Sequence, residues 1–186
     1  NRAYVYIDDI VISVNSHEEN IQKLKEVFER FRKYNLKIKP SKCHIGAGTI
    51  TYLGYEISAR KGISPGKVKT EVIANWPTPK SIKDIRAFIG LTSFFRRAIK
   101  DYSLISGPLN KLIRKDFIAS AGKSEPALKL ESFRDLKQAL ITRPCLTPVD
   151  FNRHFIVTCD ASATHFGSCL SQVDKNGIEK PCGYAS

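Results

Sequence analysis

The sequence predicts an α+β protein, because β-rich runs occupy both ends of the chain and helical periodicity fills the middle. Residues 3–7 and 10–14 are short runs of β-branched and aromatic residues. Through the central part, apolar residues recur at the three- and four-residue spacing of helices. Strand-like composition returns at 155–160, at 167–172 and in a run that ends at Tyr184. The length of 186 residues suits one large or two small domains.

The composition excludes several classes of protein. Apolar residues make up 42% and aromatic residues 10% of the chain, which is enough to fill a core and opposes intrinsic disorder. No uncharged apolar run approaches about 18 residues, so neither a membrane span nor a signal peptide is expected. The five cysteines form no C-x-x-C pair, which favours reduced intracellular thiols over a disulfide framework or a zinc site.

The way the chain starts and stops indicates part of a longer protein. It contains no Met, opens directly into a β-rich run, and stops at Tyr184-Ala185-Ser186 without a polar tail. We therefore expect an interior segment.

The net charge of +12 is concentrated in the central third. Residues 1–59 hold 9 basic and 7 acidic residues, 60–115 hold 13 and 3, and 116–186 hold 8 of each, for net charges of +2, +10 and 0. Such a concentration is typical of a surface that binds a polyanion, most often nucleic acid phosphates. A solubilising charged face is the alternative, and composition does not decide between them.

The two N-terminal runs predict a hairpin whose connection is Asp8-Asp9. Two adjacent carboxylates held at a hairpin tip would suit Mg²⁺, a hard cation that prefers oxygen ligands and also takes substrate phosphates. Paired metals support phosphoryl transfer. The alternative is a turn that uses Asp because Asp tolerates positive φ.

A helix and a third strand follow. Ser16 with Glu19 forms a capping box, an apolar stripe follows it, and Asn35 is a plausible stop. The run 49–57 predicts one strand with Gly54 at a kink or close approach.

The middle of the chain predicts three helices. The first begins at Ser64-Pro65, and its apolar stripe is Val68, Val72 and Trp76. The second begins at Ser81, ahead of Asp84, and continues through Ile99 with a buried face of Ile82, Ile85, Phe88, Ile89, Phe95 and Ile99. Its more polar sides carry Arg86, Arg96, Arg97 and Lys100. A short third helix covers Pro108–Lys115, and 116–127 is expected to be a linker.

The last third predicts a helix over Glu131–Ile141 with Phe133, Leu136 and Leu140 on its apolar face. Three strands follow, and Asp174–Gly177 supplies the turn before the third.

Several short motifs follow one another along nearly the whole chain. They are Tyr6-Ile7-Asp8-Asp9, the lysine-bearing run 36–43, Tyr52-Leu53-Gly54-Tyr55, and the segments 75–80, 85–91, 95–97, 158–162 and 184–186. In this order they resemble motifs of Ty3/Gypsy-type LTR retrotransposon reverse transcriptases: the Y-x-D-D motif, the lysine-bearing segment, the primer grip, three thumb segments and two RNase H segments. The resemblance implies the C-terminal part of a polymerase palm over 1–60 and a helical thumb over 61–116. A linker helix and the start of an RNase H-like mixed sheet would occupy 117–186.

The resemblance also implies roles for individual residues. Asp8 and Asp9 would hold Mg²⁺, or Mn²⁺, in the polymerase site, and Asp160 would be the first metal-binding carboxylate of RNase H. Tyr6 would pack near the incoming nucleotide, and Lys42 would either protonate the leaving pyrophosphate or be an ordinary solvated lysine. The residues expected to contact nucleic acid are Leu53 and Gly54 at the primer end, Arg86, Gly90 and Phe94 along the minor groove, and Arg96 and Arg97.

The activities implied are RNA-directed DNA synthesis and hydrolysis of the RNA strand. The partners implied are an RNA–DNA hybrid or template–primer duplex, a dNTP, and the rest of a polyprotein with fingers, remaining palm, remaining RNase H and integrase. The implied location is intracellular, in a cytoplasmic virus-like particle or the nucleus, with no membrane partner. Since the other metal-binding acids of both sites are not among these 186 residues, we expect the segment alone to be inactive. The alternatives are a module that only binds hybrid or duplex, and an inactive remnant.

Overall fold

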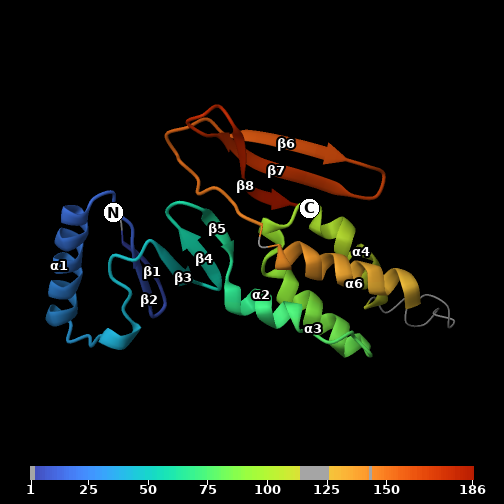
Figure 1. Cartoon of the computed structure of the whole chain (residues 1–186), viewed down its shortest axis with the longest axis horizontal. Coiled ribbons are helices and arrows are strands. Elements are labelled where there is room, and N and C mark those ends of the chain that lie inside the picture. Colours follow the sequence, from blue (N-terminus) through green and yellow to red (C-terminus); the bar gives the residue numbers. More distant parts are fainter. Residues whose placement is uncertain (1–2, 114–125, 143) are drawn as a thin grey trace. The chain divides into compact units, whose positions relative to one another are not determined.

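The computed structural model describes residues 3–113, 126–142 and 144–186 and confirms the predicted α+β class (Figure 1). The chain divides into two compact units, Asn1–Leu53 and Gly54–Ser186, and each is described by itself. The predicted linker at 116–127 falls largely outside the described residues.

The first unit contains β1 (Ala3–Tyr6), β2 (Asp9–Ile12), α1 (His17–Lys33), the 3-10 turn η1 (Pro40–Lys42) and β3 (Thr49–Tyr52). The second unit contains β4 (Tyr55–Ser58), β5 (Gly62–Pro65), α2 (Lys67–Ala74), α3 (Ile82–Ser93), the 3-10 turn η2 (Arg96–Ala98), α4 (Tyr102–Leu112), α6 (Pro126–Ile141), β6 (Ile156–Ala161), β7 (Phe166–Val173) and β8 (Glu179–Ala185).

The N-terminal hairpin forms as predicted, but its turn lies one residue earlier. Tyr6 is paired with Asp9, so the two turn residues are Ile7 and Asp8, and Asp9 begins β2. Ile7 takes a positive φ of 53°, an uncommon conformation for a β-branched residue. The expectation that Asp8-Asp9 forms the connection is therefore wrong by one position. The position of the turn is determined by the pairing register of the two strands and not by the turn preference of Asp.

The predicted start and stop of α1 are confirmed. The Ser16 hydroxyl accepts a hydrogen bond from the Glu19 backbone N–H at 3.1 Å, as an N-cap should. The Glu19 carboxylate accepts from the N–H of Asn15, one residue before the cap, at 3.1 Å. Asn35 follows the helix in the left-handed region, with φ of 55°.

The run 49–57 is not one strand. Leu53 and Gly54 have φ of 49° and 78°, the pair of positive values found in tight type I′ turns. This turn interrupts the run and leaves β3 before it and β4 after it.

The first central helix begins later than predicted and buries a different face. Ser64 and Pro65 end β5, because Pro65 is paired with Tyr55 of β4, and Gly66 is the N-cap of α2. The buried residues of α2 are Thr70 and Ile73, whereas Val68 is 72% exposed. The predicted stripe of Val68, Val72 and Trp76 is wrong for its two valines, because α6 packs against the opposite side of α2.

The second and third helices also differ from their predicted bounds. The capping box of Ser81 and Asp84 is present, but α3 ends at Ser93, and η2 carries the chain onward, so Ile99 is not helical. Phe95 and Ile99 are nevertheless buried. α4 starts at Tyr102 instead of Pro108 and continues through that proline. The burial of Tyr102, Leu109 and Leu112 outweighs the backbone hydrogen bond that an interior proline removes.

The main core lies among the helices of the second unit. Phe133, Leu136 and Leu140 of α6 are at most 3% exposed, which confirms the predicted apolar face, and they pack with residues of α2, α3 and α4. The rings of Phe88 and Phe133 lie 4.5 Å apart between centroids. Full burial of each such side chain contributes about 1.5–3 kcal/mol.

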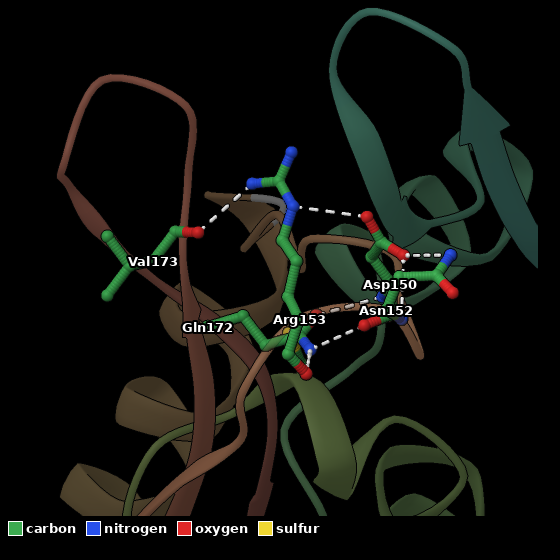
Figure 2. A network of polar contacts seen from close by, with 6 residues as sticks. Asp150, Asn152, Arg153, Gln172 and Val173 are labelled. Carbon is green, nitrogen blue, oxygen red and sulfur yellow. Dashed lines mark hydrogen bonds and ion pairs between the residues drawn. The ribbon is translucent and has the colours of Figure 1, made fainter.

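The three predicted C-terminal strands form, and they pair in the order β6–β7–β8. Both pairs are antiparallel, whereas the start of a mixed sheet was expected. The loop before β6 is fixed to β7 by a polar network (Figure 2). The Gln172 side-chain amide accepts from the Asp150 N–H at 2.9 Å and donates to the Asp150 carbonyl at 2.8 Å. The Arg153 guanidinium donates to the Asp150 carboxylate at 3.1 Å and to the Val173 carbonyl at 3.0 Å.

A β-bridge joins β5 to the segment that leads into the sheet. Ile63 and Leu146 exchange two backbone hydrogen bonds, at 2.8 and 2.7 Å, and the N–H of Thr147 donates to the Pro181 carbonyl of β8 at 2.7 Å. Gly62, with φ of 93°, lies against this bridge, and a Cβ there would collide with the Leu146 carbonyl oxygen. The bridge therefore requires glycine at this position.

We expect Gly62→Ala to lower the free energy of unfolding by about 2 kcal/mol or more, because the methyl group meets both an unfavourable φ and a backbone oxygen. Urea unfolding of the chain measures the change. The matched control is Gly90→Ala, where a Cβ meets nothing within 4 Å. On an open helical surface this exchange should raise stability by about 0.5–1 kcal/mol. Equal effects of the two variants would contradict the prediction.

Candidate nucleic-acid interface

The structure brings Gly54 against Phe94, which is 40 positions further along the chain and was expected to share the same ligand. A Cβ at Gly54 would lie 3.2 Å from Cε1 of the Phe94 ring. The Gly54 carbonyl accepts from the Gly66 N–H at 2.9 Å, and a Cβ at Gly66 would be 2.6 Å from that oxygen. Both glycines therefore permit a close approach between the turn and the start of α2 on one side and the end of α3 on the other.

Tyr55 fixes Phe94 in this position. Its hydroxyl donates to the Phe94 carbonyl at 2.9 Å, which satisfies one of the carbonyls left unpaired at the end of a helix. The Tyr55 ring lies 5.5 Å from that of Phe94 and 5.2 Å from that of Phe95, and the two phenylalanine rings are 4.9 Å apart. Phe95 is fully buried and Phe94 is 52% exposed, so the cluster has one ring in the core and one at the surface.

The outer face of α3 continues from Phe94. Arg86 and Gly90 precede it at four-residue intervals, and both are exposed. A Cβ at Gly90 would meet nothing within 4 Å, so the face is open there. The surface that consists of Gly54, Phe94, Gly90 and Arg86 is called the α3 strip below.

The two arginines of η2 have different neighbours. The Arg96 guanidinium donates to the Ser186 carbonyl oxygen and lies 5.8 Å from the centroid of the Tyr102 ring. Burial raises the pKa of Tyr55, and the positive charge of Arg97 opposes this shift.

The predicted polymerase carboxylates lie in the first unit. Asp8 and Asp9 are both exposed, and Tyr6, paired with Asp9, is 53% exposed. Two carboxylates are a hard oxygen donor set that fits a divalent cation such as Mg²⁺. Across 3–113, 126–142 and 144–186, no three His, Cys, Asp or Glu side chains gather as a metal site.

The remaining candidates are spread over three elements. Lys42 is exposed at the end of η1, and Leu53 is the last residue of the first unit. Asp160 is exposed on β6, where its backbone partner is Gly167 of β7. The roles assigned to these residues remain predictions.

Family comparisons agree with the motifs. Residues 1–57 match the family model described as reverse transcriptase (RNA-dependent DNA polymerase), and residues 128–186 match the RNase H-like domain found in reverse transcriptase. Over 97–100% of its length the chain is 32% identical to the transposon Tf2-3 polyprotein of Schizosaccharomyces pombe and 33% identical to the Pol polyprotein from transposon 412 of Drosophila melanogaster. The chain thus carries segments of these two families, and as a whole it is similar to Ty3/Gypsy-like transposon polyproteins. It spans only 13–15% of the length of these two relatives.

Solved reverse transcriptases share the fold. The foamy viral protease–reverse transcriptase in complex with dsDNA matches 98% of the chain with a TM-score of 0.82 at 23% identity, and the chain covers 37% of that protein. The same protein in complex with an RNA/DNA hybrid matches 98% of the chain with a TM-score of 0.79 at 23% identity, covering 24% of that protein. These enzyme families generally use divalent metal ions. In the described part of the chain, no helix is long and apolar enough to cross a membrane.

Tyr55 is a residue of this surface whose role the sequence did not predict. It was quoted within the primer-grip motif, but its contacts with Phe94 and Phe95 depend on a chain separation of 39 residues or more. Helical spacing within 82–94 gave no signal for such a contact.

We expect Tyr55→Phe to cost about 1 kcal/mol at neutral pH through the lost hydrogen bond to Phe94. Because burial raises the pKa of Tyr55, the stabilisation from its protonated form is complete below the unfolded value of about 10 and is lost as pH rises through the higher folded value. The stability difference from wild type should therefore shrink above about pH 10. Urea unfolding at neutral and alkaline pH measures this difference. Tyr34→Phe, at a tyrosine that is 68% exposed, should leave the free energy of unfolding unchanged at both neutral and alkaline pH.

Proposed function

We propose that this chain forms the primer-gripping turn and thumb of an RNA-directed DNA polymerase, and that the α3 strip lies along an RNA–DNA hybrid or template–primer duplex. The contact between Gly54 and the Phe94 ring carries the proposal, because it joins the two separately predicted nucleic-acid segments into one surface. The related foamy viral enzyme, whose fold is shared, is described in complex with dsDNA and with an RNA/DNA hybrid.

The chemistry of the α3 strip suits this ligand. The minor groove of an A-like duplex is wide and shallow and is recognised mainly by shape. A helix face with a glycine and a flat aromatic ring can approach such a groove closely, and Arg86 at its far end can pair with a phosphate. The surrounding segment 60–115 has a net charge of +10, from 13 basic and 3 acidic residues, which favours phosphate contact and predicts steep salt dependence.

In the whole polyprotein, Asp8 and Asp9 would hold Mg²⁺, or Mn²⁺ in its place. The bound metal would supply charge stabilisation for attack of the primer 3′-hydroxyl on the α-phosphate of a dNTP. Tyr6 would pack beside the nucleotide, Leu53 would support the primer end, and Lys42 would face the leaving pyrophosphate. Asp160 would belong to the second site, which hydrolyses the RNA strand. The same polyprotein would also contain an integrase, and it would be located in a cytoplasmic virus-like particle or in the nucleus.

A non-catalytic binding module is the second candidate. It is favoured by the finding that, within the described part of the chain, no third acidic, His or Cys side chain joins Asp8 and Asp9. Both candidates require the α3 strip to bind a duplex, so binding is tested first.

We expect the chain to bind an RNA–DNA hybrid with an affinity that falls steeply with salt. Arg86→Ala should weaken binding by about 3- to 10-fold and reduce the salt slope by about one, as expected for the loss of one phosphate contact. Fluorescence anisotropy across a KCl series measures both quantities. Lys175→Ala, which removes one charge from an exposed turn outside the basic segment, should have little effect.

In the same hybrid-binding titration, Gly90→Ala distinguishes an effect on groove binding from an effect on folding. The methyl group should stabilise the helix, yet it should weaken hybrid binding because it projects from the middle of the α3 strip. Unchanged affinity in this variant together with unchanged affinity in Arg86→Ala would contradict the proposed surface.

The metal assignment has its own test, with Mn²⁺ as the probe. We expect Mn²⁺ to broaden the backbone NMR signals of residues 6–10 selectively, and Asp8→Asn/Asp9→Asn to abolish this broadening. Glu71→Gln, at an exposed acid of α2, is the matched control and should leave the broadening unchanged. Broadening that persists in the double variant would contradict the assignment of the metal site to Asp8 and Asp9.

A further inference from the structure

The end of β8 supplies a hydrogen bond that α4 does not provide for itself. The N-cap of α4 is Asp101, whose φ of 56° is left-handed and whose side chain makes no capping hydrogen bond. The N–H of Ser103, in the first turn, has no partner within the helix, as is usual at that position. It donates instead to the Ser186 hydroxyl at 3.0 Å. Ser186 thus acts on α4 as an N-cap side chain would, from 83 positions away.

Arg96 holds the same residue from a second direction. Its guanidinium donates to the Ser186 carbonyl oxygen while it lies over the Tyr102 ring, 5.8 Å from the centroid. Tyr102 is 4% exposed, so the cation rests on a ring that is itself fixed in the core. A guanidinium held in this way is directed toward β8 and not along the α3 strip.

Small residues let the sheet approach the helices at the neighbouring contacts. A Cβ at Gly167 of β7 would lie 3.4 Å from Oδ1 of Asp101, and a Cβ at Gly183 of β8 would lie 3.9 Å from the carbonyl oxygen of Arg97. On the other side, a Cβ at Gly107 of α4 would be 3.6 Å from Nε2 of His165. The contact therefore extends over both η2 and α4.

Arg97 differs from Arg96 although the two are adjacent. Its carbonyl oxygen faces Gly183, and its guanidinium makes no hydrogen bond or ion pair with another described residue. Both arginines are exposed, but only Arg96 is held by contacts with Ser186 and the Tyr102 ring. Of the two guanidinium groups, that of Arg97 is therefore the one not engaged within the described part of the fold.

We infer that Arg96 and Ser186 lock the RNase H-like sheet onto α4, and that Arg97, not Arg96, contacts nucleic acid phosphates. The lock stands on the contacts alone, whereas the assignment of Arg97 rests on the proposed function. Because β8 pairs with β7, and Gly167 of β7 pairs with Asp160 of β6, a fixed β8 also fixes the backbone of Asp160 relative to the α3 strip. Arg96 and Ser186 are therefore positioning residues for that carboxylate.

Hydrogen exchange of the whole chain tests the lock. The Ser103 amide should exchange about 5-fold faster or more in Ser186→Ala, because about 1 kcal/mol of hydrogen bonding is lost, and also faster in Arg96→Ala. Ser186→Thr, which keeps the hydroxyl, should restore slow exchange. Amides of the core residues Phe88 and Leu136 should stay as in wild type. Wild-type exchange at Ser103 in both alanine variants, or faster exchange everywhere, would overturn the lock.

Hybrid titration tests the division between the arginines. Arg97→Ala should weaken binding by about 10-fold and lower the salt slope by about one, whereas Arg96→Ala should stay within about 2-fold of wild type with an unchanged slope. Equal losses in the two variants would overturn the division. If wild type fails to bind the hybrid at low salt, the proposed function and the Arg97 assignment both fall, while the exchange experiment still supports or overturns the lock.

Discussion

The burial of α6 against α2, α3 and α4 is the interaction on which the rest of the second unit depends. Phe133, Leu136 and Leu140 supply one side of this core, and residues such as Phe88 and Phe95 supply the other. Because the inner face of α3 is committed to this core, its outer face is fixed in direction. The same packing places η2 and the first turn of α4 where β8 meets them. The match to the RNase H-like family starts at residue 128, within α6, yet the buried side chains of this helix complete the core that it shares with α2, α3 and α4.

Close approaches at glycine are the second constraint. Gly54, Gly62 and Gly66 all lie where a Cβ would press on another part of the chain, and two of them have positive φ. Each contact joins elements that are distant in sequence: the turn to Phe94, β5 to Leu146, and the start of α2 to the turn. Glycine in this part of the chain thus has a different function from that of Gly90, which adjoins open space and leaves a helix face flat.

Local sequence signals predicted the features that are determined by residues close together in the sequence. The caps at Ser16 and Ser81, the apolar face of α6 and the presence of three C-terminal strands follow from neighbouring residues, and all were recovered. The errors arose where a distant partner decides. Pro65 was taken as the start of a helix, but pairing with Tyr55 makes it part of a strand. The two valines of α2 form a helical stripe in sequence, but the partner helix lies on the other side.

The same distinction applies to the candidate site. Short motifs made Asp8, Asp9, Gly54 and the outer face of α3 candidates, and their roles remain predictions. The motifs could not predict that Tyr55 would anchor Phe94, or that Ser186 would cap α4, because both contacts depend on which surfaces the core leaves available.

The charge distribution shows why composition alone overstates a binding surface. The net charge of +10 over 60–115 was the first sign of a polyanion partner, but not all of that charge faces solvent on one side. Arg96 is engaged with a backbone carbonyl of β8 and an aromatic ring, and beyond the basic segment Lys137 donates to the carbonyl of Trp76 at 2.9 Å. Cations used in this way connect parts of the fold and contribute little to phosphate contact. The charge available to a polyanion is therefore smaller than the sequence total, because side chains such as Arg96 are engaged within the fold.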